Sequence, residues 1–364
     1  MSNYRDWDES DVRIRPNKRG SRPRTKERPA YDKAVIGRVI TVDRGRYTAI
    51  LDEDTAGERV VVAARARELH RQAIVPGDLV ALVGDTSGQP DTLARLVRIE
   101  ERRTLLRRSA DDTDATERVV VANVDQLVIV VAAANPEPRT GFVDRALVAA
   151  YDAGIDPVLC VTKADVTDPD TFLAHYQGLD FPVVISRTTA DDAGIDARGA
   201  DGSSARLDPV ALGQLRQLLA GRVSVVLGHS GVGKSTLVNA LTGAQRATGG
   251  VNAVTGRGRH TSSNALALRI PGTPGSWLID TPGIRSFGLG LVDHEQILAA
   301  FEELAEVATG CPRGCTHLEQ TPGCALEAWA SSPESPASAA ARLASYRRLV
   351  GTGETTHEKE LGAL

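Results

Sequence analysis

Hydrophobic and polar positions in the first third of the chain follow the short alternation of a β-rich domain. Short runs rich in β-branched residues are separated by turn signals such as Asp43-Arg44-Gly45 and Pro76-Gly77-Asp78. Five such runs between residues 33 and 100 predict a small RNA-binding barrel of the oligonucleotide-binding (OB) type. Periodicity alone does not separate this barrel from an SH3-like one. The expected strands are 35–42, 47–51, 59–63, 78–83 and 93–99.

From about residue 119 the pattern changes to apolar strands that alternate with amphipathic helices. This alternation predicts a mainly parallel sheet with helices on both faces, in an α/β domain that spans residues 119–288. Residues 289–364 are expected to be helical around a cysteine cluster, with a terminal helix at 339–350. Within the α/β domain the expected strands are 124–132, 157–161, 181–185, 222–227 and 276–279, and the expected helices are 142–153, 207–220 and 236–241.

Two basic segments flank the barrel. Residues 1–32 carry eight Lys and Arg residues between positions 13 and 28 and little to bury, so we expect a disordered arm. We interpret the arm as a contact for a phosphate backbone, and a solubilising tail is the alternative. Residues 101–118 are expected to form a basic linker, either a solvated connector or an RNA contact.

The overall composition limits the class of protein. Hydrophobic residues at 41% and charged residues at 25% are typical of a soluble globular protein and exclude a mostly disordered one. Because the net charge is −4, any nucleic-acid binding must come from local basic patches. The longest apolar run, 127–134, is far shorter than the ~20 residues of a membrane helix, and the N-terminus lacks the apolar core of a signal peptide. We therefore expect a cytoplasmic protein, with monomer as the default and no membrane partner.

One segment has the pattern of a phosphate-binding loop between an apolar strand and a helix. Gly228-His229-Ser230-Gly231-Val232-Gly233-Lys234-Ser235 matches G-x-x-x-x-G-K-[ST], and Thr236 continues into the helix. Glycines allow backbone N–H groups to converge on phosphates, and the N-terminus of the helix adds a positive dipole end. Lys234 is expected to reach the β- and γ-phosphates and Ser235 to ligate Mg²⁺.

Two further motifs complete a nucleotide site. Asp280-Thr281-Pro282-Gly283 follows an apolar strand, so Asp280 is expected to hold Mg²⁺ and the N–H of Gly283 to sense the γ-phosphate. Thr162-Lys163-Ala164-Asp165 follows another strand. The Asp165 carboxylate can accept two hydrogen bonds from guanine, and adenine offers no such donor pair, which predicts GTP rather than ATP. Ser186 is expected to support the base through its backbone.

The order of these motifs is permuted. In the usual GTPase the phosphate loop comes first and the guanine motif last, whereas here 162–165 precedes 228–235. Both strands still reach the same sheet edge, so the same pocket can form. The loop 280–288 then runs directly into the C-terminal domain, which would let hydrolysis change the order of that domain.

The complete series of motifs resembles a known family. The resemblance rests on the order of the parts: a barrel, T-K-x-D, G-x-S-G-V-G-K-S-T, R-H-T, D-T-P-G-I-R-x-F-G-L and a Cys/His cluster. The series is similar to the ribosome small-subunit-dependent GTPases of the RsgA (YjeQ) family. The resemblance covers about residues 34–350. It implies GTP hydrolysis stimulated by the 30S subunit and a role late in the maturation of that subunit. The expected fold is an N-terminal OB-like barrel, a circularly permuted P-loop GTPase domain and a helical zinc-binding domain.

The residue that orients the attacking water is the least defined part of the site. Many GTPases place glutamine after the D-x-x-G glycine, but this chain has Ile284, so the free protein is expected to hydrolyse GTP slowly. In the segment before it, Thr261 is the candidate for a second Mg²⁺ ligand, with Ser262 and Ser263 left open. His260 is the candidate for orienting water once the ribosome orders this loop, and the resemblance implies the same. The alternative is that His260 contacts rRNA phosphate.

Three of the four cysteines fall within 14 residues and predict a metal site. Cys311, Cys315, His317 and Cys324 offer three thiolates and one imidazole, which fit a closed, structural zinc site. The RsgA family usually has C-x4-C-x-H-x5-C, whereas this chain has C-x3-C-x-H-x6-C. His294 is an alternative ligand.

Three functions remain open from the sequence. The leading one is a GTPase that binds the 30S subunit and its 16S rRNA in the GTP state through the barrel, the arm and the zinc domain, and leaves after hydrolysis. The first alternative is an RNA-binding assembly factor that uses GTP as a structural ligand, which Ile284 keeps open. The second is a GTPase that acts on another RNA, such as tRNA or the large subunit.

Overall fold

The computed structural model describes residues 31–43, 45–70, 72–109, 117–187, 195–198, 204–244, 265–281 and 293–361. Residues 1–30 of the expected arm lie outside these ranges. Residues Ala34–Leu364 form one compact unit. Among the described residues, no helix is both long enough and apolar enough to cross a membrane.

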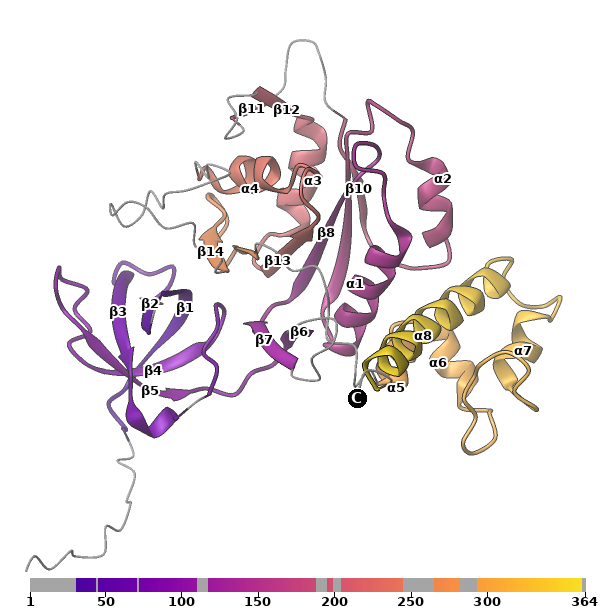
Figure 1. The fold of residues 1–364 in the computed structure, drawn as a ribbon, viewed down its shortest axis with the longest axis horizontal. Helices are drawn as coiled ribbons and strands as arrows, with labels where there is room; N and C mark the ends of the chain where they lie inside the picture. The colour runs from indigo at the N-terminus through magenta and orange to yellow at the C-terminus, as the bar shows by residue number, and fades with distance from the viewer. Residues whose placement is uncertain are drawn as a thin grey trace, which may run out of the picture. The chain divides into compact units, whose positions relative to one another are not determined.

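The N-terminal part is a five-stranded barrel. Its strands pair in the order β1-β2-β3-β5-β4, and β4 pairs back with β1, which closes the barrel (Figure 1). Every pairing in it is antiparallel except the parallel pair β3–β5, the arrangement of an OB barrel. The predicted barrel is therefore confirmed. The strands are β1 (Val35–Asp43), β2 (Arg46–Leu51), β3 (Arg59–Arg65), β4 (Leu79–Gly84) and β5 (Ala94–Ile99), with a short 3₁₀ helix η2 (Arg67–Leu69).

Inward-facing residues alternate along these strands and close the barrel core. Val39, Ala49, Val61, Leu82 and Leu96 are fully buried in one cluster. Between the barrel and the α/β sheet, β6 (Leu105–Ser109) and β7 (Glu117–Ala122) pair as antiparallel strands. The stretch expected to be a linker therefore contains β6 and the start of β7.

The central domain is a mainly parallel sheet in the order β10-β9-β8-β13-β15-β14. Only β14 is antiparallel to its neighbour in this sheet. The strand β13 lies in the middle although it comes after β8, β9 and β10 in the sequence, which is the structural form of the permutation. The strands are β8 (Gln126–Ala132), β9 (Asp156–Thr162), β10 (Val183–Ile185), β13 (Val223–Gly228), β14 (Leu266–Arg269) and β15 (Trp277–Asp280).

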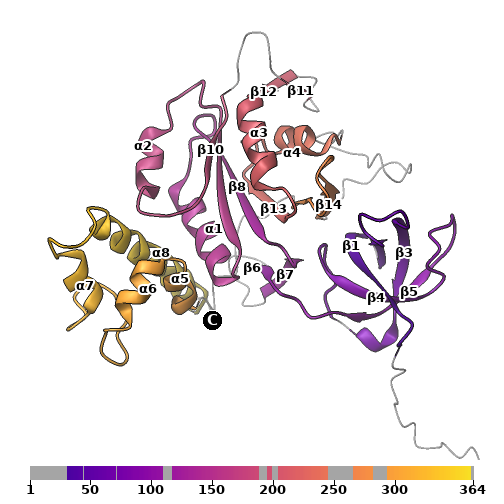
Figure 2. The same ribbon diagram turned by 180° about the vertical axis from the view of Figure 1, so that it is seen from behind.

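Helices cover both faces of this sheet, so its central strands are apolar on both sides. Helix α1 (Thr140–Asp152) lies on one face, and α3 (Pro209–Leu218) and α4 (Lys234–Thr242) lie on the other (Figures 1 and 2). In β8, Leu127, Ile129 and Val131 join the cluster that contains α1, whereas Val128 and Val130 join that of α3 and α4. Smaller elements are α2 (Asp170–Leu173), η3 (Ala174–Tyr176), β11 (Ile195–Arg198) and β12 (Ser204–Leu207).

The sheet continues from the central domain into the barrel. Leu266 of β14 pairs with Thr41 of β1, which makes one 11-stranded sheet. Ile50 of the barrel belongs to the same buried cluster as Trp277 of β15.

The C-terminal part is helical, as predicted. Phe301, Leu304, Leu326, Leu343 and Tyr346 share one buried cluster with the residues of α1, so these helices and the central sheet have a continuous core. The helices are α5 (His294–Ala299), α6 (Glu302–Ala308), α7 (Ala325–Ala330) and α8 (Ala339–Leu361) (Figure 2).

Candidate nucleotide site and metal cluster

The predicted nucleotide motifs follow strands that end at one edge of the parallel sheet. The register pairs Ala132 with Thr162, Val130 with Gly228, and Val226 with Asp280. Because these strands run in the same direction, the segments that follow them emerge side by side. This edge is where open α/β sheets bind ligands.

The phosphate loop is shaped by glycine. Gly231 and Gly233 have φ values of 83° and 88°, in the left-handed region that favours glycine, and Gly233 is the N-cap of α4. A Cβ at Gly228 would lie 2.8 Å from the carbonyl oxygen of Val130 and 2.9 Å from a methyl group of Val232. The loop therefore turns closely over β8 into α4, whose first turn contains Ser235 and Thr236. This arrangement can hold phosphate groups at the N-terminus of a helix.

Two charged groups of the site contact each other. The ammonium group of Lys234 forms an ion pair with Asp280, and their side chains are 13% and 5% exposed. Next to Asp280, the buried hydroxyl of Thr281 donates a hydrogen bond to the carbonyl oxygen of Val226 at 3.0 Å. This bond fixes the end of β15 against β13, the strand that leads into the phosphate loop.

The guanine motif is joined to the phosphate loop by a buried hydrogen bond. The hydroxyl of Thr162 donates to the carbonyl oxygen of Val232 at 2.6 Å, so the two motifs share a rigid connection. The backbone N–H of Ala164 donates to the carbonyl oxygen of Ser186 at 3.2 Å. Ser186 is buried and Asp165 is exposed at the sheet edge. The backbone of Ser186 thus holds the guanine motif in place, and its expected support of the base stays a prediction.

The segment after β8 also lines this edge, which the sequence analysis did not identify. Lys163 donates a hydrogen bond to the carbonyl oxygen of Asn135. A Cβ on Gly231 would lie 3.8 Å from the ring of Pro136. The ring of His229 packs against Phe142 of α1, with centroids 4.3 Å apart. The available signal was the polar and turn-forming sequence Asn135-Pro136, which begins at the third residue after the buried strand β8.

Several predicted site residues lie outside the described residues. They are Gly283, His260, Thr261, Ser262, Ser263 and Ile284. Their expected roles therefore rest on the sequence.

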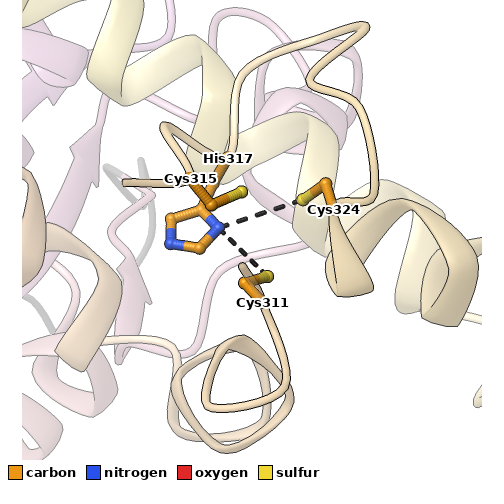
Figure 3. Close-up of side chains that lie close together, drawn as sticks. All are labelled: Cys311, Cys315, His317 and Cys324. Carbon is orange, nitrogen blue, oxygen red and sulfur yellow. Dashed lines mark hydrogen bonds between the residues drawn. The ribbon is translucent and has the colours of Figure 1, made fainter. Parts of the chain in front are cut away.

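The predicted metal ligands converge in the C-terminal part. The ligand atoms of Cys311, Cys315, His317 and Cys324 all lie within 4.8 Å of one another. Nδ1 of His317 is 3.6 Å from the sulfur of Cys311 and 3.9 Å from that of Cys324 (Figure 3). Ligands at ordinary zinc–sulfur and zinc–nitrogen distances, in a tetrahedron, stand roughly 3.5–3.8 Å apart. The cluster could therefore hold a zinc ion, and the alternative ligand His294 is not among its members.

The surroundings of the cluster favour metal binding. Burial lowers the pKa of His317, and the nearby Arg347 guanidinium lowers this pKa further, which favours the neutral imidazole that binds a metal ion. Arg347 also holds the loop, because it donates to the carbonyl oxygens of His317 and Leu318 at 3.0 and 3.2 Å. The N–H of Ala325 donates to the sulfur of Cys311 at 3.2 Å. Such contacts around the ligands fix their orientation.

Solved structures share this fold. The crystal structure of YjeQ from Thermotoga maritima is 23% identical, covers 87% of this chain and 99% of its own, and superposes with a TM-score of 0.56. YloQ, described as a circularly permuted GTPase, is 19% identical, covers 88% of this chain and 96% of its own, and has a TM-score of 0.58. Together with the strand order and the converging motifs, they place the chain in the class of circularly permuted P-loop GTPases.

The sequence comparisons identify the family. The family model for RsgA GTPase matches residues 99–198 and 203–290. "Small ribosomal subunit biogenesis GTPase RsgA" of Pseudomonas aeruginosa (strain LESB58) is 38% identical over 77% of this chain and 76% of that protein. The protein of the same name from Azotobacter vinelandii (strain DJ / ATCC BAA-1303) is 37% identical over 77% of this chain and 75% of its own length. The chain belongs to the RsgA GTPase family and hydrolyses GTP, as the motifs predicted.

Proposed function

We propose that this GTPase is stimulated by the small ribosomal subunit and acts late in the maturation of that subunit. In this proposal it binds rRNA in the GTP state and leaves after hydrolysis. The observation that carries the proposal is the permuted order of the motifs at the sheet edge. Asp280 ends the strand β15, Thr281 follows it, and the next described elements in the sequence are the C-terminal helices. Relatives named for biogenesis of the small subunit support the choice of partner.

Each group at the edge has a role in this proposal. The phosphate loop 228–235 and the start of α4 bind the phosphates through backbone N–H groups, and Lys234 exchanges its contact with Asp280 for the β- and γ-phosphates. Gly283 senses the γ-phosphate. Thr162, Lys163, Ala164 and Asp165 bind guanine, with Ser186 behind them.

The donor sets fit one magnesium and one zinc ion. Ser235, Asp280 and Thr261 supply oxygen ligands of the type that Mg²⁺ prefers, and Mg²⁺ bound with GTP neutralises charge on the phosphates. Cys311, Cys315, His317 and Cys324 supply the soft ligands of a structural zinc site with no open position. Zinc there stabilises a segment too short to bury a core of its own.

The slow GTP hydrolysis expected of the free protein follows from Ile284, the residue after Gly283. Ile284 cannot orient water, so we propose that His260 does so when the ribosome orders its loop. A His260→Ala variant should keep its affinity for GTP and lose most of the stimulated turnover. Unchanged stimulated turnover would remove His260 from catalysis and assign it to an rRNA contact.

Turnover of GTP by the free protein, and with purified 30S, 50S and 70S particles at one salt concentration, tests the proposal. Salt is held constant because phosphate contacts make binding strongly salt-dependent. Strong stimulation by 30S alone is expected. Stimulation by another particle or RNA would favour a GTPase with that partner. Tight GTP binding with no stimulation by any particle would favour an RNA-binding factor with GTP as a structural ligand.

A further inference from the structure

The barrel carries an acidic loop that contacts the GTPase sheet. This loop, residues 52–58, joins β2 to β3. Arg269 of β14 forms ion pairs with Asp54 and, at 2.5 Å, with Glu58. Asp54 also accepts a hydrogen bond from the backbone N–H of Gly275, in the turn between β14 and β15, at 2.7 Å. Asp54 thus holds both β14 and the turn that leads into β15.

Trp277 extends the contact to β15. Its indole N–H donates to Glu53, and Glu53 also accepts from Arg38 of β1 at 3.0 Å. The guanidinium of Arg269 lies 4.8 Å from the centre of the Trp277 ring, within the range of a cation–π interaction. Trp277 is only 3% exposed, so the charged groups are packed against a fixed apolar side chain. We call Glu53, Asp54, Glu58, Arg269 and Trp277 the acidic clasp.

Main-chain pairing connects the clasp to the nucleotide edge. Thr41 of the barrel pairs with Leu266, and Leu266 pairs with Asp280. Asp280 in turn pairs with Val226 of β13. The barrel is therefore two strand pairings away from the carboxylate that contacts Lys234. Because β15, which carries Asp280, pairs with β14 on one side and β13 on the other, a displacement of β14 relative to β13 would move Asp280.

We infer that the acidic clasp is a positioning element of the GTP site: Asp54 and Glu58 hold Arg269, and through β14 and β15 they fix Asp280 for Mg²⁺ and the γ-phosphate. This inference rests on the proposed role of Asp280 and adds the barrel to the groups that set its position. The phosphate loop and the guanine motif follow β13 and β9. The clasp meets β13 through the pairing of Trp277 with Val223, at the opposite end of that strand from the phosphate loop, and the charged side chains Asp54, Glu58 and Arg269 contact β14 and the turn after it. The clasp is therefore expected to affect the Mg²⁺-dependent part of nucleotide binding and not the binding of GDP alone.

The test uses the full chain with substitutions that remove charge, and the two carboxylate substitutions also keep the size of the side chain. Asp54→Asn combined with Glu58→Gln opens the clasp from the barrel side, and Arg269→Gln opens it from the sheet side. Asp52→Asn is the matched control, because Asp52 lies in the same loop but pairs with Arg59 of the barrel. Asp52 and Asp54 have φ values of 51° and 60°, which asparagine also adopts readily. Arg269→Lys is the conservative variant.

The measured quantities are affinities of a fluorescent, non-hydrolysable GTP analogue with and without Mg²⁺, and of GDP in EDTA. The gain from Mg²⁺ is the ratio of the analogue affinities with and without the ion. In the clasp variants this ratio should be at least about fivefold smaller than in the wild type, while the affinity for GDP stays unchanged. Asp52→Asn should behave like the wild type, and Arg269→Lys should recover part of the gain. An unchanged gain in both clasp variants would overturn the inference. A parallel fall in GDP affinity would also overturn it, because that result indicates general loosening.

Asp280→Asn separates this inference from the proposed function. If that variant keeps the full gain from Mg²⁺, the proposed role of Asp280 fails and the inference fails with it. If that variant loses the gain while the clasp variants keep it, the role of Asp280 stands and only the clasp inference is overturned.

Discussion

Gly228 shows how one missing side chain determines the geometry of the phosphate loop. It ends β13 where the loop passes over β8, and the carbonyl oxygen of Val130 lies only 2.8 Å from the position that a Cβ would take. The neighbour that would have to move is backbone of a fully buried strand. This crowding explains why the first position of the motif requires glycine here even without a positive φ.

Replacement of Gly228 by alanine should therefore destabilise the protein and weaken GTP binding. Overpacking of this kind costs about 1–3 kcal/mol, which denaturant unfolding can measure. Gly213→Ala is the control, because a Cβ at Gly213 in α3 meets no atom within 4 Å. That variant should gain about 0.5–1 kcal/mol, since alanine is the better helix former. Equal stability of the two variants would contradict this account.

At the scale of elements, α8 is held against α1 and η3 by polar contacts of the half-buried Arg348. Arg348 of α8 lies 3.5 Å from the carboxylate of Asp144 in α1 and donates to the carbonyl oxygen of His175 at 2.9 Å. The same guanidinium lies 5.5 Å from the centre of the Tyr176 ring. Burial raises the pKa of Asp144 above its usual value, although Arg348 opposes this shift. The C-terminal helices are thus attached through a carboxylate whose charge is costly in the folded state.

This raised pKa predicts a pH-dependent effect of Asp144→Asn. The folded state binds the proton of Asp144 more tightly than the unfolded state, so the wild type loses stability as pH rises from 3.8 through the folded-state pKa. Asparagine carries no such cost. The free energy of unfolding of Asp144→Asn relative to the wild type should therefore rise with pH over this range. Denaturant titrations at several pH values measure it, with exposed Asp91→Asn as the control; a flat difference would contradict the prediction.

The zinc cluster makes a second prediction at this scale. Cys311→Ser combined with Cys315→Ser should remove near-stoichiometric zinc and reduce hydrogen-exchange protection in α6 and α7, because those short helices adjoin the ligands. Cys160→Ala should retain the zinc. Burial raises the pKa of the Cys160 thiol to about 12, so this cysteine stays a neutral core residue in β9. Fully folded, zinc-free wild-type protein would show that the cluster is not a zinc site.

At the scale of the whole molecule, charge distribution determines how the chain would meet RNA. The net charge is −4, so a polyanion would be attracted only by local basic segments such as 13–28. Basal and stimulated hydrolysis should therefore respond differently to salt.

We expect 30S-stimulated turnover at subsaturating 30S to fall steeply between about 50 and 200 mM salt, while basal turnover changes little. Removal of residues 1–30 should make the salt dependence of stimulation shallower. A salt dependence that is the same with and without these residues would assign the phosphate contacts to the folded domains alone.

Local patterns were sufficient for much of this fold. Apolar runs predicted the central strands β8, β9 and β13, which are buried on both faces, and short runs rich in β-branched residues between turn signals predicted the five strands of the barrel. The spacing of residues was sufficient to predict the phosphate loop and the Cys/His cluster, since their ligand groups lie close together in the chain. The permuted order of the motifs was also readable directly, and it predicted the sheet edge that the structure contains.

Tertiary structure decided the contacts between distant segments. The strand β14 has only four residues, too few for a periodic signal, and its pairing with β1 joins positions more than 200 residues apart. The acidic loop 52–58 has the composition of a solvated turn, and only its position beside Arg269 makes it a clasp. The raised pKa of Asp144 likewise depends on burial against α8. Burial and cross-chain pairing are properties of the packed molecule, because a residue's environment is set by neighbours that its own sequence segment does not contain.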